Sequence, residues 1–370
     1  IKPPYFIKFL HYLYGVKILA LLLFPLALLY GFISFIRNLL FDLGFPKPKR
    51  YPFPVISVGN LSMGGTGKTP HIEYLVRLLE KSQHIAVLSR GYGRKSRGFR
   101  FADETANAQS IGDEPYQYYR KFKNVIVAVC SIRTYGINKI REVYPKTSVI
   151  LLDDAFQHRW VKPGLNILLT DFRHLYAHDY VFPTGTLREF RSGAKRADII
   201  IVTKNDKVLP IMLRKHLITQ LKPSPNQLVL FSYITYGEWV PLTNIETTKN
   251  AVTPYKNLLL LTGIVNPYPI EDYLKTCNYN VLKCQFADHH VYSEKDVIKI
   301  SNVFDSILSQ SKAIVTTEKD AARLIGTNAL VQLAHLPIYY IPIQIEFHHN
   351  DALTLSEQVN LLLNKKPISL

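Results

Sequence analysis

The sequence predicts an α/β protein: a parallel sheet with crossover helices, preceded by an N-terminal membrane-associated helix and followed by a second, smaller α/β domain. Three features of the 370 residues predict this fold. Short β-branched runs alternate with segments of helical periodicity, a glycine-rich segment stands where one such run meets its helix, and an uninterrupted apolar stretch precedes both.

The apolar stretch covers residues 18–36 and reads ILALLLFPLALLYGFISFI. Its length approaches the ~20 residues that a spanning helix needs, and no small-residue cleavage site follows it, so we expect it to stay on the mature protein. Basic residues such as Lys17 and Arg37 flank both ends and leave its orientation open. Pro25 would allow a kinked or obliquely inserted helix instead of a full span. A buried core helix is the alternative, but the stretch has no polar face. We assign 1–45 as a membrane-anchoring helix.

The domain boundaries follow the strand pattern. Six β-branched runs predict the core domain at 46–220, namely 54–58, 85–88, 125–129, 149–152, 167–169 and 199–202. Residues 221–256 are irregular and rich in proline, which predicts an inter-domain connection. Further runs at 258–261, 281–284, 313–316 and 338–341, with a closing helix near 352–363, predict a smaller α/β domain at 257–370.

The formal net charge of +17 indicates a polyanionic partner or surface. Nucleic acid is not expected, because the chain has no zinc-finger spacing, no RNP-type aromatic motif and no long Lys/Arg run. Anionic lipid and phosphorylated substrates remain. The cysteines Cys130, Cys277 and Cys284 have no metal-ligand spacing and read as reduced thiols, which fits a cytosol-facing compartment.

The glycine-rich segment at 59–70 reads GNLSMGGTGKTP and lies between a predicted strand and a predicted helix. In that setting backbone N–H groups wrap a phosphate, a lysine reaches the β/γ oxygens and a hydroxyl binds Mg²⁺, so the sheet is of the P-loop NTPase type and binds ATP. A strict Walker A motif would have glycine at 62. The absence of the signature lysine of membrane-associated switch ATPases at 63 favours a kinase. The predicted ATP-binding residues are Ser62, Met63, Gly64, Gly65, Thr66, Gly67, Lys68 and Thr69.

Two carboxylates, Asp153 and Asp154, follow the strand at 149–152. A strand that ends in acids opposite a phosphate loop supplies a Mg²⁺-bridging group, and the sequence does not decide which aspartate is nearer the metal. A solvated acidic turn is the alternative, weakened by the polar residues Gln157, His158 and Arg159 beside the pair.

With these motifs in place, the chain resembles the tetraacyldisaccharide 4'-kinase (lipid A 4'-kinase) family. The matching blocks are GNLSMGGTGKTP, SRGYGRKSRG, GDEP, DDAFQHR, PTGTLRE, ADHHVY and TTEKDAARL, which occur in this order between residues 55 and 324. The family also carries an apolar N-terminal helix. The chain departs from the family pattern at Ala155, Thr184 and Thr186, each a small-for-small change in a loop, which puts local backbone shape in doubt more than chemistry.

The resemblance implies roles for individual residues. Asp113 of GDEP would act as the base that deprotonates the sugar hydroxyl, with Glu114 beside it, and His289 of ADHH would orient Asp113 from the second domain. Without the resemblance, GDEP would read as an ordinary helix start. A zinc site made of Asp288, His289 and His290 is the competing interpretation, disfavoured because consecutive residues seldom point at one ion.

The resemblance also places Arg188 and Glu189 near the nucleotide phosphates and metal. The predicted catalytic residues are then Asp113, His289 and Lys68; the predicted metal ligands are Thr69, Asp153, Asp154 and Glu189; and the predicted substrate or phosphate contacts are Arg90, Glu114, Gln157, His158 and Arg188. Arg133 would have a role like that of Arg188, or form a surface salt bridge.

The reaction implied by the resemblance uses ATP and Mg²⁺ to convert tetraacyldisaccharide 1-phosphate into the 1,4'-bisphosphate in lipid A biosynthesis. It would take place at the cytoplasmic face of an anionic inner membrane, without an obligate protein partner. The alternative is a membrane-bound P-loop regulatory ATPase that has no lipid acceptor.

Overall fold

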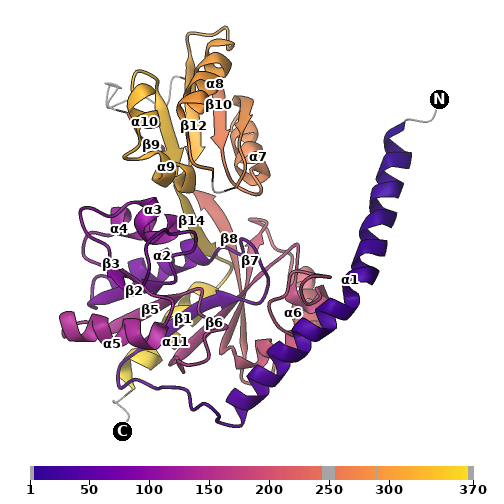
Figure 1. Cartoon of the computed structure of the whole chain (residues 1–370), viewed down its shortest axis with the longest axis vertical. Helices are drawn as coiled ribbons and strands as arrows, with labels where there is room; N and C mark the ends of the chain where they lie inside the picture. The colour runs from indigo at the N-terminus through magenta and orange to yellow at the C-terminus, as the bar shows by residue number, and fades with distance from the viewer. Residues whose placement is uncertain (1–3, 244–254, 289, 366–370) are drawn as a thin grey trace. The chain divides into compact units, whose positions relative to one another are not determined.

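The computed structural model describes residues 4–243, 255–288 and 290–365, with side chains from Leu22 onward. The chain divides into two compact units (Figure 1). Unit 1 comprises Ile1–Arg90, Asn124–Ile234 and Ile345–Leu370, and unit 2 comprises Gly91–Lys123 and Thr235–Gln344. Each unit is therefore made of more than one stretch of the chain.

Unit 1 contains a sheet in the order β14-β8-β7-β6-β1-β5-β2-β4. All neighbours from β8 to β4 pair in parallel. Its strands are β1 (Val55–Asn60), β2 (Ile85–Ser89), β4 (Ile126–Val129), β5 (Val149–Asp153), β6 (Leu165–Asp171), β7 (Ile199–Asn205), β8 (Leu228–Tyr236) and β14 (Ile343–Phe347). The residues of β1, β2 and β5 are buried throughout, as expected of parallel strands covered on both faces.

The helices of unit 1 are α1 (Pro4–Asp42), α2 (Lys68–Leu79), α5 (Arg133–Val143), α6 (Ile211–Leu221) and α11 (Asp351–Asn364), with 3₁₀ turns η1 (Tyr176–His178) and η2 (Arg191–Arg196). One face of the sheet carries a core in which Leu217 and Leu221 of α6 pack with Ile200, Val202 and Phe231. Because β1 and β5 are parallel neighbours, with Val58 opposite Asp153, the loops that follow them begin at the same edge of the sheet.

Unit 2 contains a second sheet in the order β11-β10-β12-β13-β9, parallel except for the β13–β9 pair. Its strands are β9 (Val240–Pro241), β10 (Asn257–Thr262), β11 (Asn280–Gln285), β12 (Lys312–Thr317) and β13 (Ile338–Ile341), and β3 (Arg100–Phe101) belongs to the same unit. Its helices are α3 (Ala108–Ile111), α4 (Asp113–Lys121), α7 (Tyr268–Thr276), α8 (Glu294–Asp305), α9 (Glu318–Leu324) and α10 (Asn328–Gln332). Alternate residues of β10 and β12 face two separate apolar clusters, so this sheet is also covered on both faces.

The segment 91–123 belongs to unit 2, although the sequence predicts it within the core domain at 46–220. The physical reason lies in ion pairs between α4 and α9. Lys121 Nζ lies 2.7 Å from Glu318 Oε1, Lys319 Nζ lies 2.8 Å from Glu114 Oε1, and Arg323 Nε lies 2.8 Å from Asp113 Oδ2. Sequence periodicity carries no trace of such long-range pairing.

The segment 221–256 is not only a connection, because it contains β8. The helix expected near 352–363 is α11, and it belongs to unit 1 instead of closing the second domain. Asp351 accounts for its place: this buried carboxylate accepts two hydrogen bonds of 2.7 Å from Arg214 on α6 and one of 2.7 Å from the backbone N–H of Phe231 in β8.

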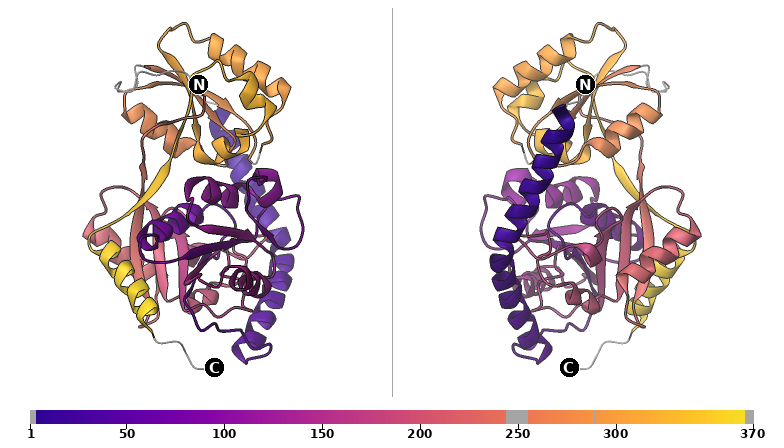
Figure 2. Two further views of the ribbon diagram at one scale, coloured as in Figure 1. Left: turned by 90° about the vertical axis from the view of Figure 1, so that its left-hand side faces the viewer. Right: turned by 90° about the vertical axis from the view of Figure 1, so that its right-hand side faces the viewer.

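Helix α1 packs against unit 1 along a narrow stripe. Ala27, Gly31, Ser34 and Phe41 recur at helical spacing and are buried, and a Cβ on Gly31 would come within 2.6 Å of the ring of Phe190. In both views of Figure 2 the second half of α1 runs alongside the sheet of unit 1. Most large apolar residues between Leu22 and Phe45 are exposed. Leu22–Asp42 is, by length and composition, a helix that could cross a membrane.

Replacing Asp351 by Ala tests the anchoring of α11. The variant leaves Arg214 and the Phe231 N–H without their shared acceptor, so we expect the free energy of unfolding in guanidinium chloride to fall by about 3 kcal/mol. Leu353→Ala on the same helix, where the side chain is 64% exposed, is the matched control and should cost less than about 0.5 kcal/mol. Equal losses in the two variants would contradict the anchoring role.

Candidate active site

The glycine-rich loop connects β1 to α2, as the sequence predicts. Gly64 (φ 120°) and Gly67 (φ 87°) adopt the left-handed conformation that favours glycine. An added Cβ at Gly64 or Gly65 would meet no atom within 4 Å, so open space lies above this part of the loop. The opposite side of the loop is held in place, because Asn60 Nδ2 donates to the Gly64 carbonyl (3.3 Å) and Thr203 Oγ1 donates to that of Thr66 (2.9 Å).

A second segment supports the loop along its backbone. The N–H of Met63 donates to the carbonyl of Thr186 (2.7 Å), and the N–H of Arg188 donates to that of Leu61 (2.8 Å). The residues between β1 and Gly64 thus pair with the PTGTLRE segment, which brings Arg188 to the phosphate loop.

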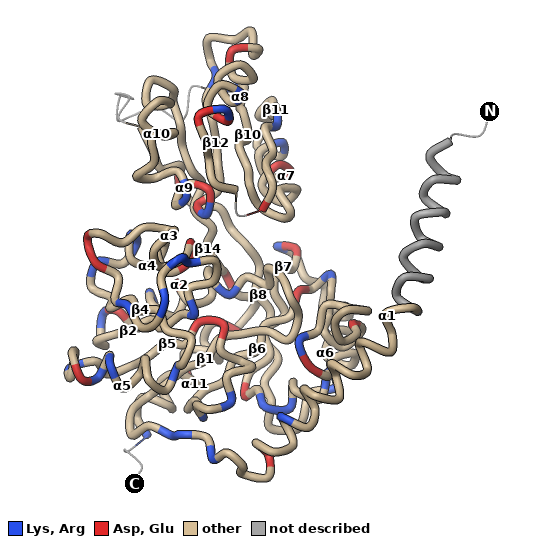
Figure 3. The backbone as a smooth tube through the Cα atoms, in the orientation of Figure 1, with Lys and Arg blue, Asp and Glu red and all other residues tan. Residues whose placement is uncertain are grey.

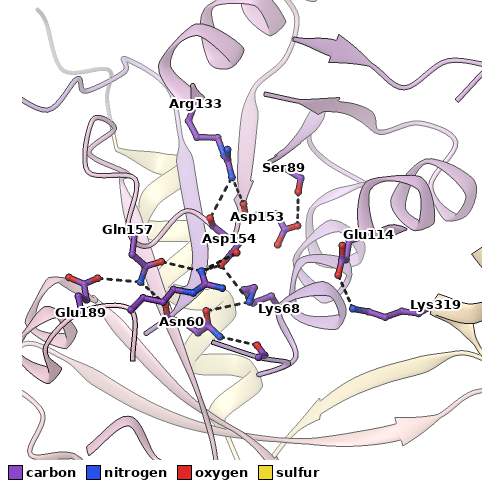
Figure 4. Close-up of polar contacts among 12 residues, drawn as sticks. Asn60, Lys68, Ser89, Glu114, Arg133, Asp153, Asp154, Gln157, Glu189 and Lys319 are labelled. Atoms are coloured by element: carbon purple, nitrogen blue, oxygen red, sulfur yellow. Dashed lines mark hydrogen bonds and ion pairs between the residues drawn. The ribbon is translucent and has the colours of Figure 1, made fainter. Parts of the chain in front are cut away.

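Asp154 is the centre of the charged cluster at this edge (Figure 4). Its Oδ1 lies 3.5 Å from Lys68 Nζ and 2.9 Å from Arg188 NH1. Lys68 Nζ also donates to Asn60 Oδ1 (3.3 Å). Burial favours a raised pKa for Asp154, but the charges of Lys68, Arg188 and Arg133 outweigh it and hold the pKa below its usual value. The carboxylate is therefore ionised at neutral pH.

Asp153 has a different environment. It is the last residue of β5, only 4% exposed, and its Oδ2 accepts a hydrogen bond from Ser89 Oγ at the end of β2 (3.0 Å). Asp154 follows with a left-handed φ of 48°, so the two neighbouring carboxylates face different partners. Asp154 is the one paired with the lysine of the phosphate loop.

Arg133 is buried, which rules out the surface salt bridge considered above. It is 2% exposed and donates to the carbonyls of Cys130 (2.6 Å) and Asp153 (3.1 Å). Desolvation lowers the pKa of Arg133 to about 10, so its guanidinium stays charged at neutral pH, close to Asp153 and Asp154.

His158 accepts the backbone N–H of Arg133 at its Nε2 (3.1 Å), at the start of α5. Burial, together with the charges of Arg133 and Arg90, lowers its pKa to about 4. His158 is therefore neutral at physiological pH, and a cationic contact to phosphate would need a different protonation state. Arg90 itself is exposed at the end of β2.

Gln157 and Glu189 form the rim of the cluster. Gln157 Nε2 donates to the Asn60 carbonyl (2.8 Å) and to Glu189 Oε1 (3.2 Å). Glu189 is fully buried and accepts hydrogen bonds from Arg196 (2.7 Å) and from Asn38 of α1 (2.5 Å). The predicted metal ligand Glu189 thus faces these partners, whereas Thr69 is buried near the start of α2 beside Lys68.

Asp113 and Glu114 begin α4 in unit 2, where Arg323 and Lys319 pair with them. Burial favours a raised pKa for Glu114, but Lys319 lowers it overall. Arg323 NH1 also donates to Asp320 Oδ1 (3.0 Å) and to the Gly263 carbonyl (2.6 Å). The predicted partner His289 lies outside the described residues, and His290 Nε2 lies 3.0 Å from Asp296 Oδ2.

No group of three or more His, Cys, Asp or Glu side chains that could hold a metal ion occurs among the described residues. The neighbours of Asp288 and His290 are Arg323, at 3.9 Å from Asp288, and Asp296. Within those residues the zinc interpretation has no support.

Sequence reasoning missed three contributors. Asn60 binds both Lys68 and the loop, His71 joins the Gly67 carbonyl (2.7 Å) to Ser232 (3.0 Å), and Arg323 holds Asp113. Asn60 could have been suspected from its place at the end of the strand, and Arg323 from its place in the TTEKDAARL block. Nothing in the sequence marks the contacts of His71.

A parallel sheet with a glycine loop, a lysine at the start of the next helix and an ionised aspartate after the neighbouring strand defines a P-loop nucleotide-binding protein. Comparison with known proteins narrows the class. The model of the tetraacyldisaccharide-1-P 4'-kinase family (LpxK) matches residues 19–361. The chain belongs to this family, which confirms the resemblance seen in the sequence.

Individual relatives agree. The chain is 48% identical to the tetraacyldisaccharide 4'-kinase of Flavobacterium johnsoniae over 87% of this chain and 92% of that protein. It is 44% identical to that of Bacteroides thetaiotaomicron over 89% of both. The crystal structure of LpxK from Aquifex aeolicus in complex with ATP superposes with a TM-score of 0.73 at 26% identity, over 93% of this chain and 99% of that one. The predicted α/β fold of P-loop type is thereby confirmed.

The neutral state of His158 predicts a loss of stability in acid. Its folded pKa of about 4 lies below the ordinary 6.5, so below about pH 6.5 the unfolded chain binds a proton that the folded chain does not. Stability should therefore fall as the pH drops from about 6.5 toward 4. The buried His71, whose pKa burial also lowers to about 4, adds to the effect.

Urea unfolding at pH 7.5 and pH 5 measures this loss. In His158→Gln a neutral oxygen can accept the Arg133 N–H without titrating, so the difference between the two pH values should shrink. His216→Gln, at an exposed position of α6, is the matched control and should leave the difference unchanged. An undiminished pH dependence in His158→Gln would refute the assignment.

Proposed function

We propose that this chain transfers the γ-phosphoryl group of ATP to the 4'-hydroxyl of tetraacyldisaccharide 1-phosphate, forming the 1,4'-bisphosphate. The observation that carries the proposal is the cluster around Asp154, in which Lys68 and Arg188 converge on one ionised carboxylate beside the glycine loop. It occurs in a chain that belongs to a 4'-kinase family along almost its whole length.

The residues of the loop fit a nucleotide triphosphate and its metal ion. Gly64 and Gly65 leave open space in which phosphate oxygens would fit, and Lys68 would reach the β/γ oxygens. The Thr69 hydroxyl and Asp154 would hold Mg²⁺, with Asp153 behind them. When bound, Mg²⁺ neutralises the charge that builds up on the transferred group.

Arg188 would supply a further positive charge. Its guanidinium is shared between Asp154 (2.9 Å) and Gln157 (3.4 Å). Both contacts are to acceptors beside the loop, so a small side-chain movement would let Arg188 reach an equatorial oxygen of the γ-phosphoryl group.

Asp113 is the proposed base for the acceptor hydroxyl, with His289 as the residue that would orient it. Arg323 fixes the Asp113 carboxylate through Nε at 2.8 Å. A carboxylate held in this way can accept a hydrogen bond from the acceptor hydroxyl. The reaction therefore needs the aspartate mainly for positioning and for a hydrogen bond to the hydroxyl, as a loose phosphoryl-transfer transition state allows.

Membrane attachment at the cytoplasmic face of the inner membrane is part of the proposal. The exposed apolar residues of α1 between Leu22 and Leu40 would lie among acyl chains, and the net charge of +17 would favour an anionic surface.

Thin-layer analysis of γ-labelled ATP tests the activity. The full chain is incubated with the disaccharide lipid in mixed micelles with Mg²⁺, and we expect label on the lipid. Label found only as free phosphate would favour the alternative, a regulatory ATPase that has no lipid acceptor. Omitting the disaccharide lipid shows the background hydrolysis.

The Asp113→Asn variant tests the base. Removing the proton acceptor while keeping a similar shape should lower kcat by about 10²- to 10⁴-fold, with nucleotide affinity changed little because the glycine loop is intact. Asp305→Asn, at the exposed end of α8, is the control for the loss of one carboxylate in unit 2. Turnover of Asp113→Asn at the rate of the control would remove the base assignment.

A further inference from the structure

A cavity of approximately 720 Å³ in unit 1 lies apart from the glycine loop. Its walls include Val55 and Ser57 of β1, Asn166 of β6 and Asp198, which precedes β7. These residues lie toward the amino ends of parallel strands, whereas the phosphate loop follows their carboxyl ends. Ser57 precedes Asn60 by three residues, which is about 10 Å along a strand. The linker between α1 and β1 and the end of α11 complete the walls.

Two residues in the walls of this cavity each have a buried polar atom without a hydrogen-bond partner within the described parts of the chain. These atoms are Ser57 Oγ, in a residue that is 2% exposed, and Asn166 Oδ1. Ser57 and Asn166 are opposite each other in the β1–β6 register, so they lie on the same face of the sheet. Asn166 Nδ2 is already used, since it donates to the Arg196 carbonyl (3.0 Å). A buried acceptor beside a buried hydroxyl matches a ligand that carries hydroxyl groups.

The charge of the cavity indicates an anion. Four of its basic side chains, Lys47, Arg50, Lys162 and Lys365, have no ion pair among the residues that the structure describes. Figure 3 shows Lys and Arg gathered along the linker between α1 and β1. The other two cations are engaged, Arg159 with Asp42 (2.5 Å) and Arg196 with Glu189 (2.7 Å).

Asp198 is the other acid in the walls besides Asp42; its Oδ2 accepts the backbone N–H of Asn166 (2.7 Å), and its charge attracts Lys162 and Lys365. The walls of the cavity therefore carry more positive than negative charges. Phosphate is the anion that such a mixture of Lys and Arg binds well.

We propose that this cavity binds a phosphate group that carries neighbouring hydroxyls, such as a glycerol phosphate: Ser57 and Asn166 contact the hydroxyls, and Lys47, Arg50, Lys162 and Lys365 contact the phosphate. The source can be a lipid headgroup or a free polyol phosphate. Phe41 and Asp42, the last residues of α1, line the cavity, so a headgroup is the nearer source if α1 enters the membrane as proposed above.

The fluorescence of Trp160 measures this binding. Trp160 is one of two tryptophans; it packs on Phe41 at 5.4 Å between ring centroids and precedes Val161 of the cavity wall. In a Trp239→Phe background of the full chain, in non-ionic micelles, sn-glycerol 3-phosphate and phosphatidylglycerol are titrated separately. Inorganic phosphate and phosphatidylcholine are the comparison probes. We expect a saturable change with at least one hydroxylated probe and a weaker response to the comparison probes.

Two variants test the assigned contacts. The double variant Lys162→Gln/Lys365→Gln should weaken binding about tenfold to thirtyfold, and Ser57→Ala about threefold to tenfold. Lys215→Gln, an exposed position of α6, is the control for a lost cation. A response to phosphatidylglycerol alone identifies the lipid source, and one to glycerol 3-phosphate alone identifies the free source.

No saturable response to either hydroxylated probe, or equal affinity in the double variant and in Lys215→Gln, overturns the proposal. The labelled-ATP assay is run on the same variants. Because the cavity lies apart from the glycine loop, the double variant should still transfer label to the lipid acceptor. If the double variant no longer binds the hydroxylated probes but still transfers label to the lipid, the cavity and the kinase activity are separate. A failure of the proposed kinase activity would instead appear as no label transfer by the parent chain.

Discussion

The candidate site depends on one shared carboxylate. Asp154 forms ion pairs with Lys68, which follows the glycine loop, and with Arg188 of the PTGTLRE segment. Three stretches that are far apart in the sequence therefore meet at one negative charge. Burial makes that charge costly unless it is compensated, and the two cations, with Arg133 behind them, supply the compensation. The same balance holds Lys68 and Arg188 beside the glycine loop.

Much of this arrangement could be predicted from the sequence, because local signals encode it. Buried parallel strands are short β-branched runs, and a loop that holds phosphate needs glycine at fixed positions, so most strands of both sheets and the position of the loop were correctly predicted, whereas β8, β9 and β14 were not. The strand β8 was missed because the prolines around it favoured an irregular connection. The role of Glu189 as a buried partner of Arg196 and Asn38 could not be predicted, since neither contact has a sequence signature.

The assignment of 91–123 to unit 2 shows a second limit of prediction from the sequence. An inserted segment belongs to whichever body it packs against, and that depends on pairs separated by about two hundred positions, such as Asp113 with Arg323. Such pairs are invisible to periodicity, although both members lie in recognisable blocks. The family blocks GDEP and TTEKDAARL are thus adjacent in space within unit 2, joined by the pairs Asp113–Arg323 and Glu114–Lys319.

The buried stripe of α1 also limits how much of this helix can be deleted without disturbing unit 1. Tyr30 donates to the Arg188 carbonyl (3.0 Å) and Asn38 to Glu189, so the helix that resembles a detachable anchor supports the segment that carries Arg188. Removing the whole helix would remove these two hydrogen bonds, the two that Arg159 donates to Asn38 and Asp42, and the contact of Phe41 with Trp160. A shorter truncation that removes only the residues before Ala27 would remove exposed apolar side chains, such as Leu22 and Leu26, and would keep these hydrogen bonds and the contact of Phe41.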